Sequence, residues 1–290
     1  MATYQKTKNQ KRPAASLSAS DIVGDHPITS CFLSGWLSPT DSHTDFGVPH
    51  RLLFEQKRPS KKTVAILENL LKEHHVSDEK LKRVRRLQDV LNKRGFKATA
   101  TGLRAFPRND KTRKGNFAEV FLSEYLNLTG KGKTLVYRLR FNPNVEQSMK
   151  GDDVLAFNFD RTIPEIVVGE AKFRATPTKA VVEEMLNSLE KAYKIGVPMS
   201  LQFVTDRLYE MKSALADRVM ECSILILERK LVLNYAGLVI SGSGVEGHVQ
   251  QHCRALVPRS AIISVALEDG SVVIKSCFEE LERKHGFDPH

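Results

Sequence analysis

The first third of the chain has apolar residues at helical spacing in two stretches. Ser60 and Ser77 each precede one stretch, and the second stretch ends near Gly95. Serine often caps the N-terminus of a helix, and glycine often follows the last turn. The apolar positions are Val64, Leu67 and Leu71 in the first stretch and Leu81, Val84, Leu87, Val90 and Leu91 in the second. The pattern therefore predicts two amphipathic helices, each with one face for the core or for a partner.

From residue 115 onward, helical and strand patterns alternate. The predicted elements are a helix at 115–126, strands at 134–142, 153–160 and 165–174, a helix at 178–194 and a strand at 198–206. Arg161 to Pro164 joins the second and third of these strands as a hairpin. The order αβββαβ predicts an α/β fold, in the α+β sense of a mixed sheet with packed helices, and an N-terminal helical extension precedes it.

The remaining pattern divides the chain into three regions. Residues 1–20 have the composition of a flexible basic arm, and residues 21–100 form a basic, partly helical region with an irregular stretch around Trp36. Residues 101–290 form the larger domain. After the αβββαβ core, this domain is predicted to contain a helix from about Leu208, apolar runs at 223–227 and 231–240, and a closing helix at 278–285.

Positive charge is concentrated in one block. The chain of 290 residues has a formal net charge of +10, and between Arg51 and Lys114 there are 19 Lys or Arg against 7 Asp or Glu, a net of 19 − 7 = +12. Such a surface favours nucleic-acid phosphates, although it would also attract acidic proteins. No apolar run reaches the roughly 18 residues of a membrane span, and no secretory signal is visible, so we expect a cytoplasmic protein. The four scattered cysteines are expected to be free thiols.

Five Glu-x-Lys triplets occur in the sequence, so the triplet by itself identifies no site. Glu170 and Lys172 differ from the others because they follow an apolar strand and because an acid, Asp153, begins the preceding strand after a Gly-x-Asp turn. The other four triplets begin at Glu55, Glu210, Glu228 and Glu282. Context therefore selects Asp153, Glu170 and Lys172.

The geometry of the hairpin supports this choice. If the turn is centred between Arg161 and Thr162, residues whose numbers sum to 323 face each other, which pairs Asp153 with Glu170. A slip of the turn centre by one residue would pair Asp153 with Lys172 instead. Asp152 would point to the opposite face in both registers, and it remains the fallback for the first carboxylate.

Two carboxylates and a lysine suit the hydrolysis of a phosphodiester. Asp153 and Glu170 supply hard oxygen ligands for Mg²⁺ or Mn²⁺, the metal activates a water, and Lys172 steadies that water or the developing negative charge. Glu119, on the preceding predicted helix, is a further candidate for the same cluster, although an exposed helical glutamate is an equally ordinary interpretation. The non-catalytic alternative for the triad is a surface ladder of salt bridges on a hairpin.

Three competing motifs are weaker. Asp206 and Glu228 could form a second acid pair with Lys230, but a predicted helix separates them and no tight hairpin brings them together. Gly132-Lys133-Thr134 lacks the earlier glycine of a Walker A loop, which argues against nucleotide hydrolysis. His248 and His252 have helical spacing without the acid of a zinc-protease motif, so we interpret them as structural or surface residues.

Three segments of the sequence resemble the nuclease subunits of Hachiman antiphage systems, the HamA family. They are Phe106 to Val120, Met149 to Val154 with its Lys-Gly-Asp-Asp run, and Gly169 to Phe173 with its Gly-Glu-Ala-Lys run. The resemblance spans about residues 101–206. It implies a restriction-endonuclease-like fold of the PD-(D/E)xK superfamily, and cleavage of DNA by Asp153, Glu170 and Lys172. A departure is that Asp152, and not proline, precedes Asp153.

The resemblance also implies partners. It predicts a complex with a superfamily 2 helicase, the HamB-like subunit, in a prokaryotic defence system. The lack of a long apolar run predicts no membrane association. Four cations within or directly after the three segments are expected to contact DNA; they are Arg113, Lys114, Lys150 and Arg174. The alternative is a catalytically silent subunit that binds DNA or docks the helicase.

Overall fold

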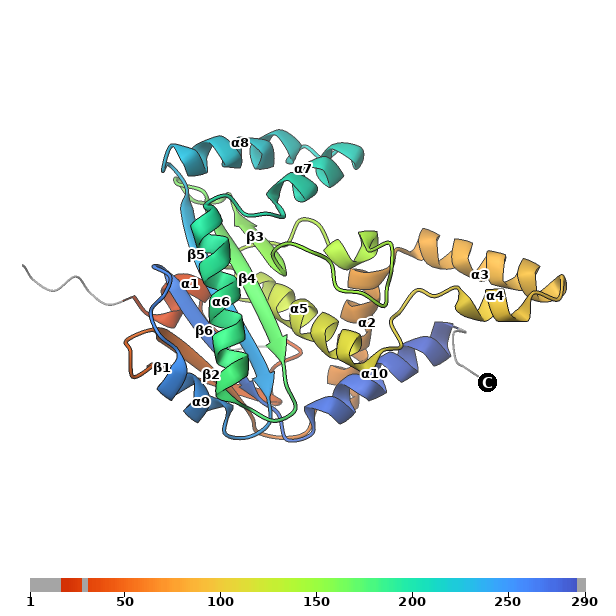
Figure 1. Cartoon of the computed structure of the whole chain (residues 1–290), viewed down its shortest axis with the longest axis horizontal. Coiled ribbons are helices and arrows are strands. Elements are labelled where there is room, and N and C mark those ends of the chain that lie inside the picture. The colour runs from red at the N-terminus through yellow and green to blue at the C-terminus, as the bar shows by residue number, and fades with distance from the viewer. Residues whose placement is uncertain (1–16, 28–30, 286–290) are drawn as a thin grey trace, which may run out of the picture.

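The computed structural model, which describes residues 17–27 and 31–285, is built on one mixed β-sheet (Figure 1). Within these residues the sheet has six strands in the order β1-β2-β6-β5-β4-β3. The strands are β1 Leu37–His43, β2 Pro49–Glu55, β3 Val154–Asn158, β4 Glu165–Phe173, β5 Val232–Ser241 and β6 Ser260–Ala266. The four inner strands run parallel, and β1 and β3 are antiparallel at the two edges. The mixed α/β architecture expected from the sequence is confirmed.

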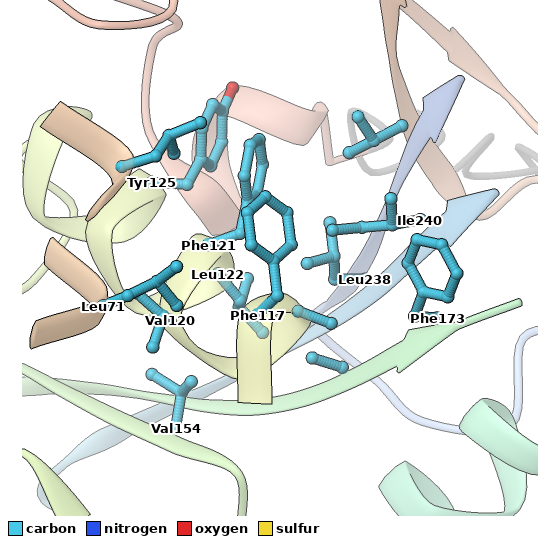
Figure 2. Packing of buried hydrophobic residues seen from close by; sticks show 14 of the residues in the cluster. Leu71, Phe117, Val120, Phe121, Leu122, Tyr125, Val154, Phe173, Leu238 and Ile240 are labelled. Carbon is cyan, nitrogen blue, oxygen red and sulfur yellow. The ribbon is translucent and has the colours of Figure 1, made fainter. Parts of the chain in front are cut away.

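Helices cover both faces of this sheet. One layer contains α1 Ala19–Val23, α2 Lys61–His75, α5 Asp110–Leu128 and α10 Gly270–His285, and the other contains α6 Lys179–Ile195, α7 Leu201–Glu210, α8 Ala216–Leu227 and α9 Val245–His252. Successive residues of β4 alternate between the two cores, since Val167 packs in the first and Val168 in the second. Figure 2 shows Phe117 and Phe121 of α5 beside Leu238 of β5 in the first core. A sheet buried on both faces explains the near-continuous apolar runs of its parallel strands.

The predicted N-terminal helices are confirmed, including their caps. The Ser60 hydroxyl accepts a hydrogen bond from the Thr63 amide at 3.1 Å, and the Ser77 hydroxyl accepts one from the Lys80 amide at 3.2 Å. The second helix, α3 Asp78–Lys93, forms a hairpin with α4 Lys97–Gly102 that projects from the body of the protein (Figure 1). None of the helices in the described ranges is long and apolar enough to cross a membrane.

At both ends of the chain the structure extends or limits the predicted elements. The stretch around Trp36, expected to be irregular, leads into β1 and β2, which join the main sheet. The predicted arm at residues 1–20 lies mostly outside the described residues, which begin at residue 17, but Ser18 caps α1. The closing helix is confirmed and begins eight residues earlier than predicted, at Gly270. The four cysteines are free, as expected.

Two predicted strands are wrong, and the apolar run at 223–227 is helical. Residues 134–142 contain η1, a short 3-10 helix at Arg138–Phe141, and a single β-bridge, between Lys133 and Phe157, lies just before them. Residues 198–206 lie mostly in α7, and residues 223–227 are the end of α8. In α7 the buried residues Leu201, Val204, Thr205 and Leu208 recur at helical spacing. A short apolar run is compatible with either element, and packing decides between them.

Candidate active site

The β3–β4 hairpin places the selected acids opposite each other. Val154 pairs with Gly169 and Asn158 with Glu165, so paired residue numbers sum to 323. The predicted register is therefore confirmed, and Asp153, one residue before β3, lies beside Glu170. Oδ2 of Asp153 accepts a hydrogen bond from the backbone amide of Ala171 at 2.9 Å. This bond fixes Asp153 against the Glu170-Ala171-Lys172 segment.

Glu170 and Lys172 form a close ion pair on the same face of β4. Nζ of Lys172 lies 2.5 Å from Oε1 of Glu170, and both side chains are mostly buried. Nζ is also 3.9 Å from Oε1 of Glu184 on α6. Side chains two residues apart on a strand point to the same face. The strand β4 by itself therefore brings the Lys172 ammonium group and the Glu170 carboxylate together.

Glu119 reaches the same place from the other helix layer. It lies on α5, its side chain is only 15% exposed, and Nη1 of Arg138 is 3.8 Å from its Oε1. Glu119, Asp153, Ala171 and Lys172 all line one open groove of about 1050 Å³. The helix glutamate and the hairpin acids, far apart in sequence, therefore meet at a single surface.

Asp152, the fallback acid, takes a different position. Its carboxylate accepts a hydrogen bond from the Ser200 amide at 2.8 Å, and its own amide donates to Oγ of Ser200 at 2.9 Å. Asp152 is 5% exposed. Its carboxylate is therefore engaged with the start of α7, and Asp153 is the acid that lines the groove.

The acids of the groove hold their protons more tightly than usual. Burial, together with the negative charges of Asp153 and Glu170, raises the pKa of Glu119 to about 8 against the opposing effect of Arg138. Burial and the charge of Asp153 raise the pKa of Glu170 to about 7. The pKa of Asp153 is also raised, chiefly by burial. Three crowded, desolvated carboxylates favour any cation that compensates their charge.

The lysine of the site stays charged. Burial acts to lower the pKa of Lys172, but the charge and hydrogen bond of Glu170, with further contributions from Asp153 and Glu184, raise it overall. At neutral pH this side chain is an ammonium group that donates hydrogen bonds and carries positive charge.

The donor set suits a hard divalent cation. In the described ranges, no group of three His, Cys, Asp or Glu side chains is placed so that it could hold a metal ion. Magnesium does not require one, because it is usually held by one or two carboxylates together with waters and substrate phosphates. Asp153 supplies such a carboxylate at the groove, Glu170 lies next to Asp153 and Lys172, and Glu119 lines the same groove. The residues present therefore fit Mg²⁺ or Mn²⁺.

Comparison with known proteins identifies the family. The model of the HamA family matches residues 30–281. The chain is also 35% identical over 263 residues to the Hachiman protein HamA of Bacillus cereus, an alignment that covers 90% of this chain and 94% of that protein. This chain belongs to the HamA family. The match includes the whole groove, and it extends well beyond the segments in which the sequence motifs lie.

The four cations predicted to bind DNA occupy different surroundings in this HamA-family protein. Lys114 and Arg174 line the groove, where Lys114 pairs with Asp110 at 2.6 Å and Arg174 with Glu184 at 2.7 Å. Lys150 is exposed and lies outside the groove lining. Arg113 is buried and its guanidinium lies 2.8 Å from Glu282, so it has a structural partner. We therefore keep Lys114 and Arg174 as candidates for phosphate contact.

The competing motifs are not assembled into sites. Glu228 caps the end of α8 and forms an exposed ion pair with Lys230 at 2.8 Å, whereas Asp206 lies on α7 and accepts a hydrogen bond from Gln202. The rings of His248 and His252 on α9 lie 5.9 Å apart between centroids and are tilted by 40° to each other.

Sequence reasoning missed two residues of the cluster, Arg138 and Glu184. Arg138 was assigned to a strand that does not form, and Glu184 resembled any solvent-facing glutamate of an amphipathic helix. The only signal for Arg138 was the i, i+3 spacing of the apolar residues Val136 and Leu139, which suits a 3-10 turn.

Proposed function

We propose that this HamA-family chain is a metal-dependent deoxyribonuclease with its active site in the groove. The observation that carries the proposal is the placement of Asp153 against the backbone of Ala171, between Glu170 and Lys172. A salt-bridge ladder would not need a third acid from another layer, whereas Glu119 converges on the same groove. The pattern corresponds to the PD-(D/E)xK nucleases, and we propose that β3, β4, α5 and α6 form a restriction-endonuclease-like core.

The metal would be held by Asp153 and Glu170, with Glu119 beside them. When bound, Mg²⁺ or Mn²⁺ would polarise the phosphate and lower the pKa of a water. Lys172 donates hydrogen bonds from a charged ammonium group, which suits it to orient the attacking water or to stabilise charge on the phosphate. Lys114 and Arg174 are placed in the groove lining to bind the phosphates on either side.

The groove suits a polymeric substrate better than a small molecule. It is open and lined by side chains of both charges along its length. Small-molecule sites are more often concave and mostly apolar. The basic α3–α4 hairpin adds a second cationic surface, so DNA is the substrate that the charge distribution favours.

We further propose a role in antiphage defence with a helicase partner. The similar Bacillus cereus protein carries the Hachiman name. Phosphate contacts alone give no sequence choice, and a nuclease of this kind would endanger its own host. A superfamily 2 helicase bound to this chain would restrain its cleavage of host DNA. Co-purification of the tagged chain with the helicase encoded beside it tests this part; failure to co-purify while the isolated chain cuts intact plasmid would contradict it.

A cleavage assay tests the nuclease itself. Purified full-length chain is incubated with plasmid in Mg²⁺ or in EDTA, and Asp153→Asn is compared with wild type. We expect nicked or linear product with wild type but not with Asp153→Asn, and only when metal is present. The control is Glu228→Gln, which removes the acid of an exposed Glu-x-Lys pair elsewhere and should retain activity. Absence of cleavage with and without the partner would leave a non-catalytic DNA-binding subunit as the function.

A further inference from the structure

Arg138 is a buried arginine directly behind the acidic cluster. Its side chain is 5% exposed, and it begins the short helix η1 in the segment between α5 and β3. The buried side chains of Val136 and Leu139 hold this segment on the protein. A buried guanidinium requires partners for its charge and for its N–H groups, so its neighbours indicate what it does.

The guanidinium of Arg138 has two different neighbours. Nη2 donates a hydrogen bond to the carbonyl oxygen of Lys150 at 3.1 Å, and Nη1 lies 3.8 Å from Oε1 of Glu119. Nη1 is buried and has no hydrogen-bond partner among the residues that the structure describes. Such donors are uncommon in folded proteins and call for an explanation in the function of the group. Here the charge is directed at a carboxylate of the groove.

Lys150 begins the turn that carries Asp153. The next residue, Gly151, has a φ of +110°, and a Cβ there would lie 2.6 Å from Oγ of Ser200 and 3.8 Å from Nη2 of Arg138. Only glycine fits both the backbone conformation and the space. The turn is therefore held between Ser200 on one side and Arg138 on the other, which sets the position of Asp153.

Arg138 approaches the carboxylates from the interior of the protein. Glu119 and Asp153 line both the groove and a second, small cavity of about 10 Å³, whereas Arg138 lines only the small cavity and not the groove. A substrate in the groove would meet the carboxylates and not the guanidinium. Arg138 therefore acts through Glu119 and Asp153 and does not act on the substrate.

We propose that Arg138 is a positioning residue for the metal-binding acids, holding the Asp153 turn through Lys150 and keeping Glu119 directed at the same space. This inference rests on the proposed metal site. Partners behind metal ligands typically change metal affinity by about 10- to 100-fold when removed. Coulomb's law alone predicts the opposite sign, because removal of a nearby positive charge would tighten the binding of a dication. The direction of the change therefore separates positioning from simple charge repulsion.

The test measures Mn²⁺ binding to the full-length chain by isothermal titration calorimetry in the absence of DNA. We expect wild type to bind, Asp153→Asn to lose binding, and Arg138→Met to bind about 10- to 100-fold more weakly. The matched control is Arg140→Met, in the same short helix, whose guanidinium donates to the carbonyl oxygen of Glu73 and lines neither the groove nor the small cavity. It should keep wild-type affinity, and thermal melts show whether each variant is folded.

Each outcome has a distinct meaning. If wild type binds and Asp153→Asn does not, equal or tighter binding by folded Arg138→Met overturns the role of Arg138 and leaves the metal site intact. If wild type binds no Mn²⁺, the proposed metal site fails and this inference fails with it. If Arg138→Met does not fold, Arg138→Lys decides, because an ammonium group keeps the charge but lacks the rigid fork in which one nitrogen reaches Lys150 and the other faces Glu119. Unchanged affinity in Arg138→Lys would then overturn the proposal.

Discussion

The side chain of Asp153 accepts a hydrogen bond of 2.9 Å from the backbone amide of Ala171, the residue between Glu170 and Lys172. The Asp153 side chain, just before β3, is thus fixed to the backbone of β4 at the point where that strand carries Glu170 and Lys172. The bond also occupies one oxygen of Asp153 and orients the other. The proposed chemistry depends on this relationship, because two carboxylates share a metal only when their separation is fixed.

Glu170→Gln and Lys172→Met should each reduce Mg²⁺-dependent plasmid cleavage by about 100-fold or more, the size typical of losing a group that stabilises developing charge. Folding should be retained, because Lys172 lines the groove, Glu170 pairs with it, and neither side chain belongs to an apolar core. Initial rates on supercoiled plasmid measure the effect. Lys230→Met, which breaks the exposed Glu228 pair, is the control and should cleave normally. Full activity in either groove variant would remove that residue from the site.

Glu119→Gln should stabilise the metal-free protein at pH 9 and have little effect at pH 5. Burial and neighbouring acids raise the native pKa of Glu119 to about 8, from an ordinary value near 4.5. Between these two pKa values the native state therefore binds more protons than the unfolded state. As pH rises through that window, the contribution of Glu119 to the free energy of unfolding falls. Glutamine resembles the protonated acid at every pH. Thermal melts in EDTA at the two pH values measure the difference.

Added Mg²⁺ gives the matching test for Glu119. If this carboxylate contributes to the metal site, Mg²⁺ should raise the melting temperature of wild type at pH 9 more than that of Glu119→Gln, because ligand binding to the native state stabilises it. Equal stabilisation of both proteins would place Glu119 outside the metal site.

Neutralising the exposed cations of α3 should reduce the salt dependence of DNA binding. Arg83 and Arg86 are exposed on the projecting hairpin, whereas the guanidinium of Arg85 donates to the carbonyl oxygen of His285 at 2.9 Å. Each lost phosphate contact lowers the slope of log affinity against log salt by about one. Arg83→Gln with Arg86→Gln should therefore lower it by about two in anisotropy titrations. Arg85→Gln is the control, and its slope should match wild type.

Acid should destabilise the fold through His75. Burial lowers the pKa of this histidine to about 4, and its neutral ring donates from Nδ1 to the Leu71 carbonyl and accepts at Nε2 from Asn116. The unfolded state, with an ordinary histidine pKa near 6.5, binds more protons below that pH, so stability falls between about pH 6.5 and 4. At pH 5 the loss should be about 2 kcal/mol, an order-of-magnitude figure.

Urea unfolding of wild type and His75→Gln at pH 7.5 and pH 5 measures this loss. The glutamine variant should be less stable at pH 7.5 but should lose less on acidification. The exposed His43 provides the control, since His43→Gln should follow the wild-type pH dependence. Parallel curves for wild type and His75→Gln would contradict the assignment to His75.

The sequence by itself determined the elements whose information is local. The N-caps of α2 and α3 depend on a serine and the three residues after it, so both starts were predictable. A short turn and a period of two place Asp153, Glu170 and Lys172 on one face of the β3–β4 hairpin in both registers that the sequence left open, and the structure selects the register in which Asp153 lies beside Glu170. The choice among five Glu-x-Lys triplets followed from the same local pairing.

Only the tertiary structure decided which other residues join that hairpin. Glu119 and Arg138 come from segments whose sequence patterns do not specify where they pack, and burial against β3 and β4 brings them together. The stretches at 134–142 and 198–206 are short apolar runs that fit a strand or a helix equally well. Their packing partners lie far away in the sequence, and the free energy of burying side chains against those partners selects the conformation.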